Sequence, residues 1–193
     1  MKLDKVKGKL NKVMMFKLIE MTIFCCGIFY LVNFADTNWQ VTQLSVAAIS
    51  TIALLTLFVA YDIKQLIIIT QLQRGYNSGI APLQKKIEQL KLTIVTYVKF
   101  TLLMLPLYPV LLLLAGKIFF NIDFLEAKRQ AYFITNAGLG AVFLIMAVWF
   151  FRQLSSKNIN NPTAKILLAG SGWYQANSAY KFLKEIENFE NEA

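Results

Sequence analysis

Residues 92–120 read LTIVTYVKFTLLMLPLYPVLLLLAGKIFF, and this stretch decides the fold class. It contains only two charged side chains, Lys99 and Lys117. A helix needs about 20 apolar residues to cross the hydrocarbon core of a bilayer, which is about 30 Å thick. The core of a soluble protein needs only short apolar runs, so a run of this length favours a helix in lipid.

Three further apolar stretches have the same character, at residues 14–35, 44–61 and 131–151. The hydrophobic fraction of the 193-residue chain is 56% and the charged fraction is 16%, whereas globular proteins have about 45–50% and about 25%. The sequence therefore predicts an all-α membrane protein with four transmembrane helices within residues 14–152. A signal peptide is the alternative for the first stretch, but its end lacks the small-residue pair that a signal peptidase needs.

The distribution of lysine and arginine predicts the orientation, because cations accumulate on the cytoplasmic side of membrane proteins. Fourteen cations near the span ends lie on the side that carries both termini, and only Lys117, Lys128 and Arg129 lie on the other. We therefore expect a multi-pass protein of the cell inner (plasma) membrane with cytoplasmic N- and C-termini. The same rule explains the net charge of +9, so nucleic acid is not expected as a partner.

Three segments on the predicted cytoplasmic side have the apolar spacing of helices. Residues 1–13 form a basic amphipathic lead-in. Residues 62–91 form an antiparallel helical stalk between the second and third spans, and its second arm carries an apolar stripe of Leu83, Ile87, Leu90 and Ile94. The tail, residues 153–193, contains an amphipathic helix at about 174–190. The apolar face of that helix supplies the candidate partner-binding residues Phe182, Leu183, Ile186 and Phe189.

Glu20, Asp62 and Lys99 are the ionisable residues expected at membrane depth. A charged side chain at a helix centre costs roughly 2.5–3.5 kcal/mol on insertion scales, so such residues are candidates for function. Lys99 could meet Glu20 across the bundle. Three interpretations stay open: a site for proton or ion coupling, a structural ion pair, and a Lys99 side chain that extends towards the headgroups.

Pro106 and Pro109 each remove a backbone donor and predict a kink in the third span, so they are a candidate gating hinge. The chain has no histidine, which removes the commonest general base and metal ligand. Its two cysteines, Cys25 and Cys26, are adjacent and are expected to be buried, unreactive thiols. No catalytic, cofactor-binding or metal-binding residue is predicted.

The end of the chain resembles a known group of proteins. Residues 171–176 read SGWYQA, residues 182–190 read FLKEIENFE, and residues 157–160 read KNIN. These segments resemble small four-span inner-membrane proteins of the Bacteroidota type, which share a basic N-terminus and a closing FLxEIExFE tail. That family is uncharacterised, so the resemblance implies an architecture and no catalytic residues. Its members are often encoded near extracytoplasmic-function sigma factors, which implies a regulatory link.

These features favour an integral membrane protein without enzymatic activity. We expect a regulatory or scaffold protein whose stalk and tail bind a cytoplasmic protein. The alternative is a small oligomeric transporter or channel that uses Glu20 and Lys99. The expected partners are the lipid bilayer, a cytoplasmic protein and a second copy of the chain, and no cofactor is expected.

Overall fold

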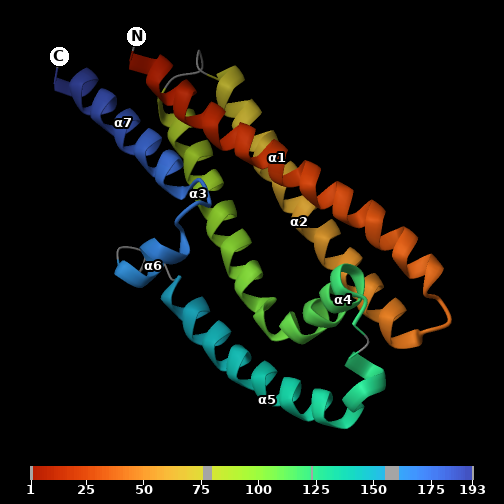
Figure 1. The fold of residues 1–193 in the computed structure, drawn as a ribbon. Helices are drawn as coiled ribbons and strands as arrows, with labels where there is room; N and C mark the ends of the chain where they lie inside the picture. The colour runs from red at the N-terminus through yellow and green to blue at the C-terminus, as the bar shows by residue number, and fades with distance from the viewer. Residues whose placement is uncertain (1, 76–79, 123, 155–160, 193) are drawn as a thin grey trace. The chain divides into compact units, whose positions relative to one another are not determined.

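The computed structural model describes residues 2–75, 80–122, 124–154 and 161–192 (Figure 1). In chain order the helices are α1 (Lys2–Thr37), α2 (Thr42–Arg74), α3 (Ile80–Leu103), the 3-10 turn η2 (Leu105–Leu107), α4 (Tyr108–Phe120), α5 (Phe124–Gln153), α6 (Pro162–Leu167) and α7 (Trp173–Glu192). The described residues contain no strand. The all-α prediction is therefore confirmed.

Four segments are long and apolar enough to cross a membrane: Lys7–Thr37, Thr42–Arg74, Ala81–Phe120 and Ile134–Gln153. The prediction of four spans is confirmed at this level of length and composition. Large apolar side chains cover their outer surfaces, among them Phe29, Phe119 and Ile145, which are 74%, 77% and 71% exposed. An apolar exterior of this extent fits hydrocarbon as the surrounding solvent.

The two longest helices, α1 and α2, extend well beyond the thickness of the hydrocarbon core. The 33 residues of α2 extend about 50 Å at 1.5 Å per residue, whereas the hydrocarbon core measures about 30 Å. Helix α1 has 36 residues and joins the predicted lead-in to the first span without a break, because no helix-breaking residue separates them. The turn expected at residues 76–79 lies outside the described residues.

The chain divides into two compact units. Unit 1 contains Met1–Ile23, Phe58–Val98 and Asn160–Ala193, and unit 2 contains Phe24–Leu57 and Lys99–Ile159. Unit 1 therefore combines the N-terminal part of α1, the two arms of the predicted stalk, and the tail. Unit 2 combines the remaining parts of the four predicted spans.

The core of unit 1 contains side chains from all of these segments. The apolar stripe predicted on α3, Leu83, Ile87, Leu90 and Ile94, is at most 2% exposed. Other buried residues of this core are Leu10 and Val13 of α1, Ile69 and Leu72 of α2, Ala164 of α6, and Ala176, Ala179 and Leu183 of α7. The tail helix α7 thus packs its apolar face into the core that the stalk also uses.

Unit 2 has a smaller core of Leu31, Ala35, Leu44, Ala47, Ala48, Leu113 and Leu114. Its third span breaks at η2, which contains Pro106, and Pro109 follows in the first turn of α4. Proline is tolerated in a first turn because the N–H it lacks has no partner within the helix there. The prolines therefore interrupt the span where the sequence predicts a kink, and their role as a gating hinge stays a prediction.

Candidate functional site: a buried ionic cluster and two open surfaces

Polar side chains from three helices meet inside unit 1. The Lys17 ammonium of α1 lies 2.6 Å from Glu20 Oε2 and 2.9 Å from Asp62 Oδ1 of α2. Tyr97 of α3 donates its hydroxyl to Glu20 Oε1. The same ammonium lies 3.9 Å from the centre of the Tyr97 ring, a distance that favours a cation–π interaction. We name these four residues the ionic cluster.

The ionic cluster is shielded from solvent. The side chains of Lys17, Asp62 and Glu20 are 1%, 0% and 19% exposed. Phe58 of α2 packs edge-on against the Tyr97 ring with a centroid distance of 5.5 Å. Loss of the one cation would leave a fully buried carboxylate without a counter-charge, which is strongly destabilising. The cluster therefore ties α1, α2 and α3 together.

Gln65 follows Asp62 by one turn on the same face of α2, and it is fully buried. Within the described part of the chain, neither polar atom of its amide has a hydrogen-bond partner, and Asp62 Oδ2 also has none. Asp62 Oδ1 makes no well-aligned hydrogen bond either, so its contact with Lys17 is an ion pair. An unpaired buried polar group costs about 1–3 kcal/mol. Helix α2 thus carries hydrogen-bond acceptors beside the ionic cluster, on Asp62 and Gln65, and none of the described donors makes a well-aligned hydrogen bond to them.

The structure brings together two of the three predicted intramembrane charges. Glu20 and Asp62 both contact Lys17, which the sequence presented only as one more orienting cation. Lys99 lies in unit 2, where its ammonium is 4.6 Å from the centre of the Phe151 ring. The i, i+3 spacing of Lys17 and Glu20 was an available signal for their pairing. Nothing in the sequence indicated Tyr97, because its role depends on how α3 packs.

The tail helix α7 docks on α3 through one lysine. The Lys91 ammonium lies 4.8 Å from the centres of the Trp173 and Tyr180 rings and donates a 2.9 Å hydrogen bond to Asn177 Oδ1. This contact places a cation between two aromatic faces, where cation–π attraction contributes about 0.5–2 kcal/mol. Lys91 therefore anchors the tail to the stalk.

The turn before α7 touches α1. Gly172 has a φ of 85°, in the left-handed region, and a Cβ atom on it would lie 2.9 Å from Val13 Cγ1. Gly170 has a similar φ of 79°, but no atom lies within 4 Å of the position its Cβ would take. Nearby, Lys9 of α1 donates a hydrogen bond to Ser178 Oγ of α7. The absence of a side chain at residue 172 lets the turn approach α1.

The predicted partner-binding residues of the tail differ in how far the chain itself covers them. Leu183 is fully buried in the core of unit 1, and Phe182 is half-buried. The side chains of Ile186 and Phe189 lie outside the described part of the structure. Part of the apolar face of α7 is therefore covered by the chain itself.

A groove of about 620 Å³ lies between α2 and α3 in unit 1. Its lining includes Ile63, Lys64, Ile67 and Gln71 of α2 and Gln89 and Leu92 of α3. Ile63, Ile67 and Leu92 are 45%, 51% and 67% exposed. We name this surface the stalk groove, and it combines open apolar side chains with a lysine and two amides.

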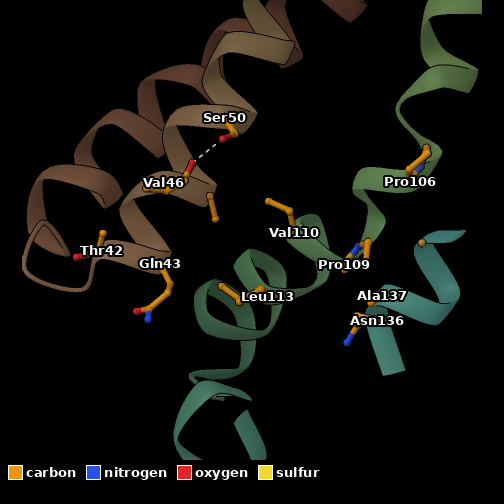
Figure 2. A pocket seen from close by; sticks show the side chains of 12 residues that line it. Thr42, Gln43, Val46, Ser50, Pro106, Pro109, Val110, Leu113, Asn136 and Ala137 are labelled. Atoms are coloured by element: carbon orange, nitrogen blue, oxygen red, sulfur yellow. Dashed lines mark hydrogen bonds between the residues drawn. The ribbon is translucent and has the colours of Figure 1, made fainter. Parts of the chain in front are cut away.

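A second cavity lies wholly within unit 2. It has a volume of about 570 Å³ and is formed by the first turns of α2, the proline-containing kink with α4, and part of α5 (Figure 2). Most of its lining is apolar, and the polar side chains in it come from Thr42, Gln43, Ser50 and Asn136. We name it the unit 2 cleft.

Side chains of the metal-ligating types and thiols can both be located among the described residues. Among the described residues, no three or more His, Cys, Asp or Glu side chains gather in a way that could hold a metal ion. Cys25 and Cys26 are unpaired thiols. Both are exposed on α1, so the prediction that they are buried was wrong, because no other helix covers their side chains.

Comparison with known proteins gives no relative: no family model matches the chain, and no curated protein or solved structure is significantly similar to it.

Proposed function

We propose that the chain is a non-enzymatic protein of the cell inner membrane, with both termini in the cytoplasm, and that unit 1 is a docking module for a cytoplasmic protein. In this proposal the protein acts as a regulator or scaffold. The observation that carries it is the stalk groove, an open surface of unit 1 that combines exposed apolar side chains with a lysine and two amides.

The depth of unit 1 supports this assignment. Twenty helical residues span about 30 Å, the thickness of the hydrocarbon core. Counted inwards from Thr37 at the outer end of α1, and from Thr42 at the outer end of α2, the first residues beyond this length are Lys17 and Asp62. The ionic cluster would then lie at the inner boundary of the hydrocarbon, and most of unit 1 would lie beyond it in the cytoplasm.

The charge of unit 1 indicates the chemistry of its partner. Its three segments contain 14 Lys and Arg residues against 8 Asp and Glu residues, a net charge of +6. Complementary potentials steer association and select partners. An amphipathic helix is a common ligand for an apolar groove between two helices. The partner that fits is a cytoplasmic protein with an acidic amphipathic helix.

A capture experiment with matched variants tests the proposal. We expect purification in mild detergent, followed by mass spectrometry, to recover a stoichiometric cytoplasmic protein whose yield falls with rising salt. The paired substitutions Ile67→Gln and Leu92→Gln should abolish this recovery. Ile166→Gln changes an apolar residue of α6 that is 74% exposed and does not line the groove, so it should leave recovery unchanged.

Two outcomes would contradict the docking module. One is recovery of nothing but the protein's own oligomer. The other is an equal loss of partner from the groove variant and from Ile166→Gln, which would place the contact elsewhere on unit 1.

A small oligomeric transporter is the second candidate, and the ionic cluster favours it. Asp62 is a buried carboxylate with unused acceptor capacity beside Gln65, and buried ionisable residues of membrane proteins often mark proton and ion pathways. If Glu20 and Lys99 carry coupling, Glu20→Gln with Lys99→Met should abolish ion-dependent flux in liposomes. Unchanged flux in this double variant, or no flux in the unmodified protein, would exclude this use of the two charges.

A further inference from the structure

The unit 2 cleft has three walls that come from different parts of the chain. Val46 of α2 faces Val110 and Leu113 of α4, and Ala137 of α5 lies on the far side (Figure 2). At about 570 Å³ the cleft is within the size range of ligand sites, about 300–1,000 Å³. Its three walls therefore enclose enough space for part of an organic molecule.

The kink creates this space. The backbone turns at η2, so α4 does not continue the line of α3, and Pro106 and Pro109 both line the cavity. Gly140 brings α5 near the turn, since a Cβ atom on it would lie 3.6 Å from the Pro106 carbonyl oxygen. A larger side chain at residue 140 would extend into the cleft.

Polar groups are concentrated at one end of the cleft. Thr42 and Gln43 form the first turn of α2, and Asn136 lies in the first part of the fourth predicted span, residues 131–151. Both sites are at the predicted outer ends of their spans. Deeper in α2, the Ser50 hydroxyl is already used in a 2.7 Å hydrogen bond to the Val46 carbonyl. A molecule that fits is elongated, polar at its outer end and apolar along its length.

The surroundings of the cleft indicate which kind of elongated molecule would bind in it. Val46, which lines the cleft, is 57% exposed and belongs to a helix apolar enough to span a membrane. The cleft is thus continuous with a surface that faces hydrocarbon. An unfilled apolar space forfeits dispersion contacts along its lining. No Lys or Arg is among the lining residues, so the site offers no cation to a charged headgroup.

From these observations we infer that the unit 2 cleft binds one acyl chain of a membrane phospholipid, with the ester region beside Gln43 and Asn136. The lipid enters from the surrounding bilayer, and the chain lies against Val110, Leu113 and the kink. This inference needs the four helices to lie in a membrane, and it does not depend on the stalk groove or on any cytoplasmic partner.

Photolabelling with a matched pair of glycine variants tests the site. The protein is placed in nanodiscs that contain a phosphatidylcholine with a diazirine on one acyl chain, irradiated, and mapped by mass spectrometry. Adducts are expected on the peptides that contain residues 46–50 and 106–113. Gly140→Leu should lower these adducts about tenfold. Gly138→Leu should not, because a Cβ at Gly138 meets no atom within 4 Å and Gly138 does not line the cleft.

A second variant covers the case in which Gly140→Leu does not fold. Ala137 is exposed in the cleft wall, so Ala137→Leu adds volume without displacing a buried neighbour and should lower the same adducts. Equal labelling of the unmodified protein and both filling variants would overturn the inference. Disulfide crosslinking of Val46→Cys to a second copy of the chain, in a Cys25→Ser, Cys26→Ser background, would place a protein in the cleft instead of lipid and would also overturn it.

Discussion

Lys17 balances two carboxylates, of which Asp62 is fully buried and Glu20 is 19% exposed. Replacing Lys17 with Met keeps most of the side-chain volume and removes the charge. We expect Lys17→Met to lower the free energy of unfolding by about 3–5 kcal/mol, because it leaves Asp62 buried without a counter-charge. Thermal unfolding in detergent, followed by circular dichroism, measures the effect.

Two further variants separate charge balance from loss of packing. Lys64→Met removes an exposed lysine of α2 and should change stability little. Lys17→Met combined with Asp62→Leu removes both buried charges and should recover much of the loss, since a buried pair replaced by apolar groups is often neutral. A double variant as unstable as Lys17→Met alone would contradict this account.

Tyr97 contributes to the ionic cluster through its ring, which contacts the Lys17 ammonium, and through its hydroxyl, which donates to Glu20. One substitution separates these two contributions. Tyr97→Phe keeps the ring beneath the Lys17 ammonium and removes the hydroxyl that donates to Glu20. Hydrogen bonds to charged groups contribute about 1.5–3 kcal/mol, and we expect the lower end because Glu20 is partly exposed. In a Glu20→Gln background the same substitution should cost less, which a double-mutant cycle measures. An identical cost in both backgrounds would argue against the bond.

At the scale of the helices, the sequence predicted well what depends on local pattern. Four apolar runs of sufficient length, two prolines in the third run, and the stripe from Leu83 to Ile94 all correspond to observed elements. The sequence did not predict which segments pack against these apolar faces. An amphipathic helix shows that its apolar face needs an apolar neighbour, but its sequence does not show which segment that neighbour is. The docking of α7 on α3 therefore came only from the structure.

The turn between α6 and α7 gives a test of that docking. Gly172→Ala should destabilise the tail, because it combines a positive φ with a methyl group 2.9 Å from Val13. Gly170→Ala shares the positive φ and meets no atom, so it should cost only the conformational strain, about 1 kcal/mol. We expect proteolysis within α7 to be fast in Gly172→Ala and close to normal in Gly170→Ala. Equal rates in the two variants would mean that the contact with Val13 is unimportant.

At the scale of the whole molecule, the orientation rests on the lopsided distribution of cations. Single cysteines in a Cys25→Ser, Cys26→Ser background report the side of the membrane. An impermeant thiol reagent should label Gln40→Cys and Leu125→Cys from outside, and should reach Lys7→Cys and Lys184→Cys only after the membrane is opened. Labelling of all four from one side would refute the four-span arrangement.

Only some residues of the ionic cluster could be predicted from the sequence. Glu20 and Asp62 were identified because charges are rare in apolar runs, which is a local property. Their common partner, Lys17, was indistinguishable from the other lysines near the N-terminus. Gln65 was predicted only as part of the polar face of the second helix, because an uncharged side chain in the polar stretch after Asp62 has no unusual neighbours in sequence. The assembly of the cluster depends on three helices meeting, which no local pattern encodes.

Unit 1 combines the beginning, the middle and the end of the chain, and this affects its biosynthesis. About 75 residues separate the end of its middle segment from α7, which a ribosome adds in about 4–15 s. Until α7 has been synthesised, it cannot cover the apolar side chains of Leu10, Val13 and the α3 stripe. A chain that ends before α7 lacks the helix that covers these apolar side chains. We therefore expect such a truncated chain to be degraded faster in cells than the 193-residue chain, which a pulse-chase measurement would show.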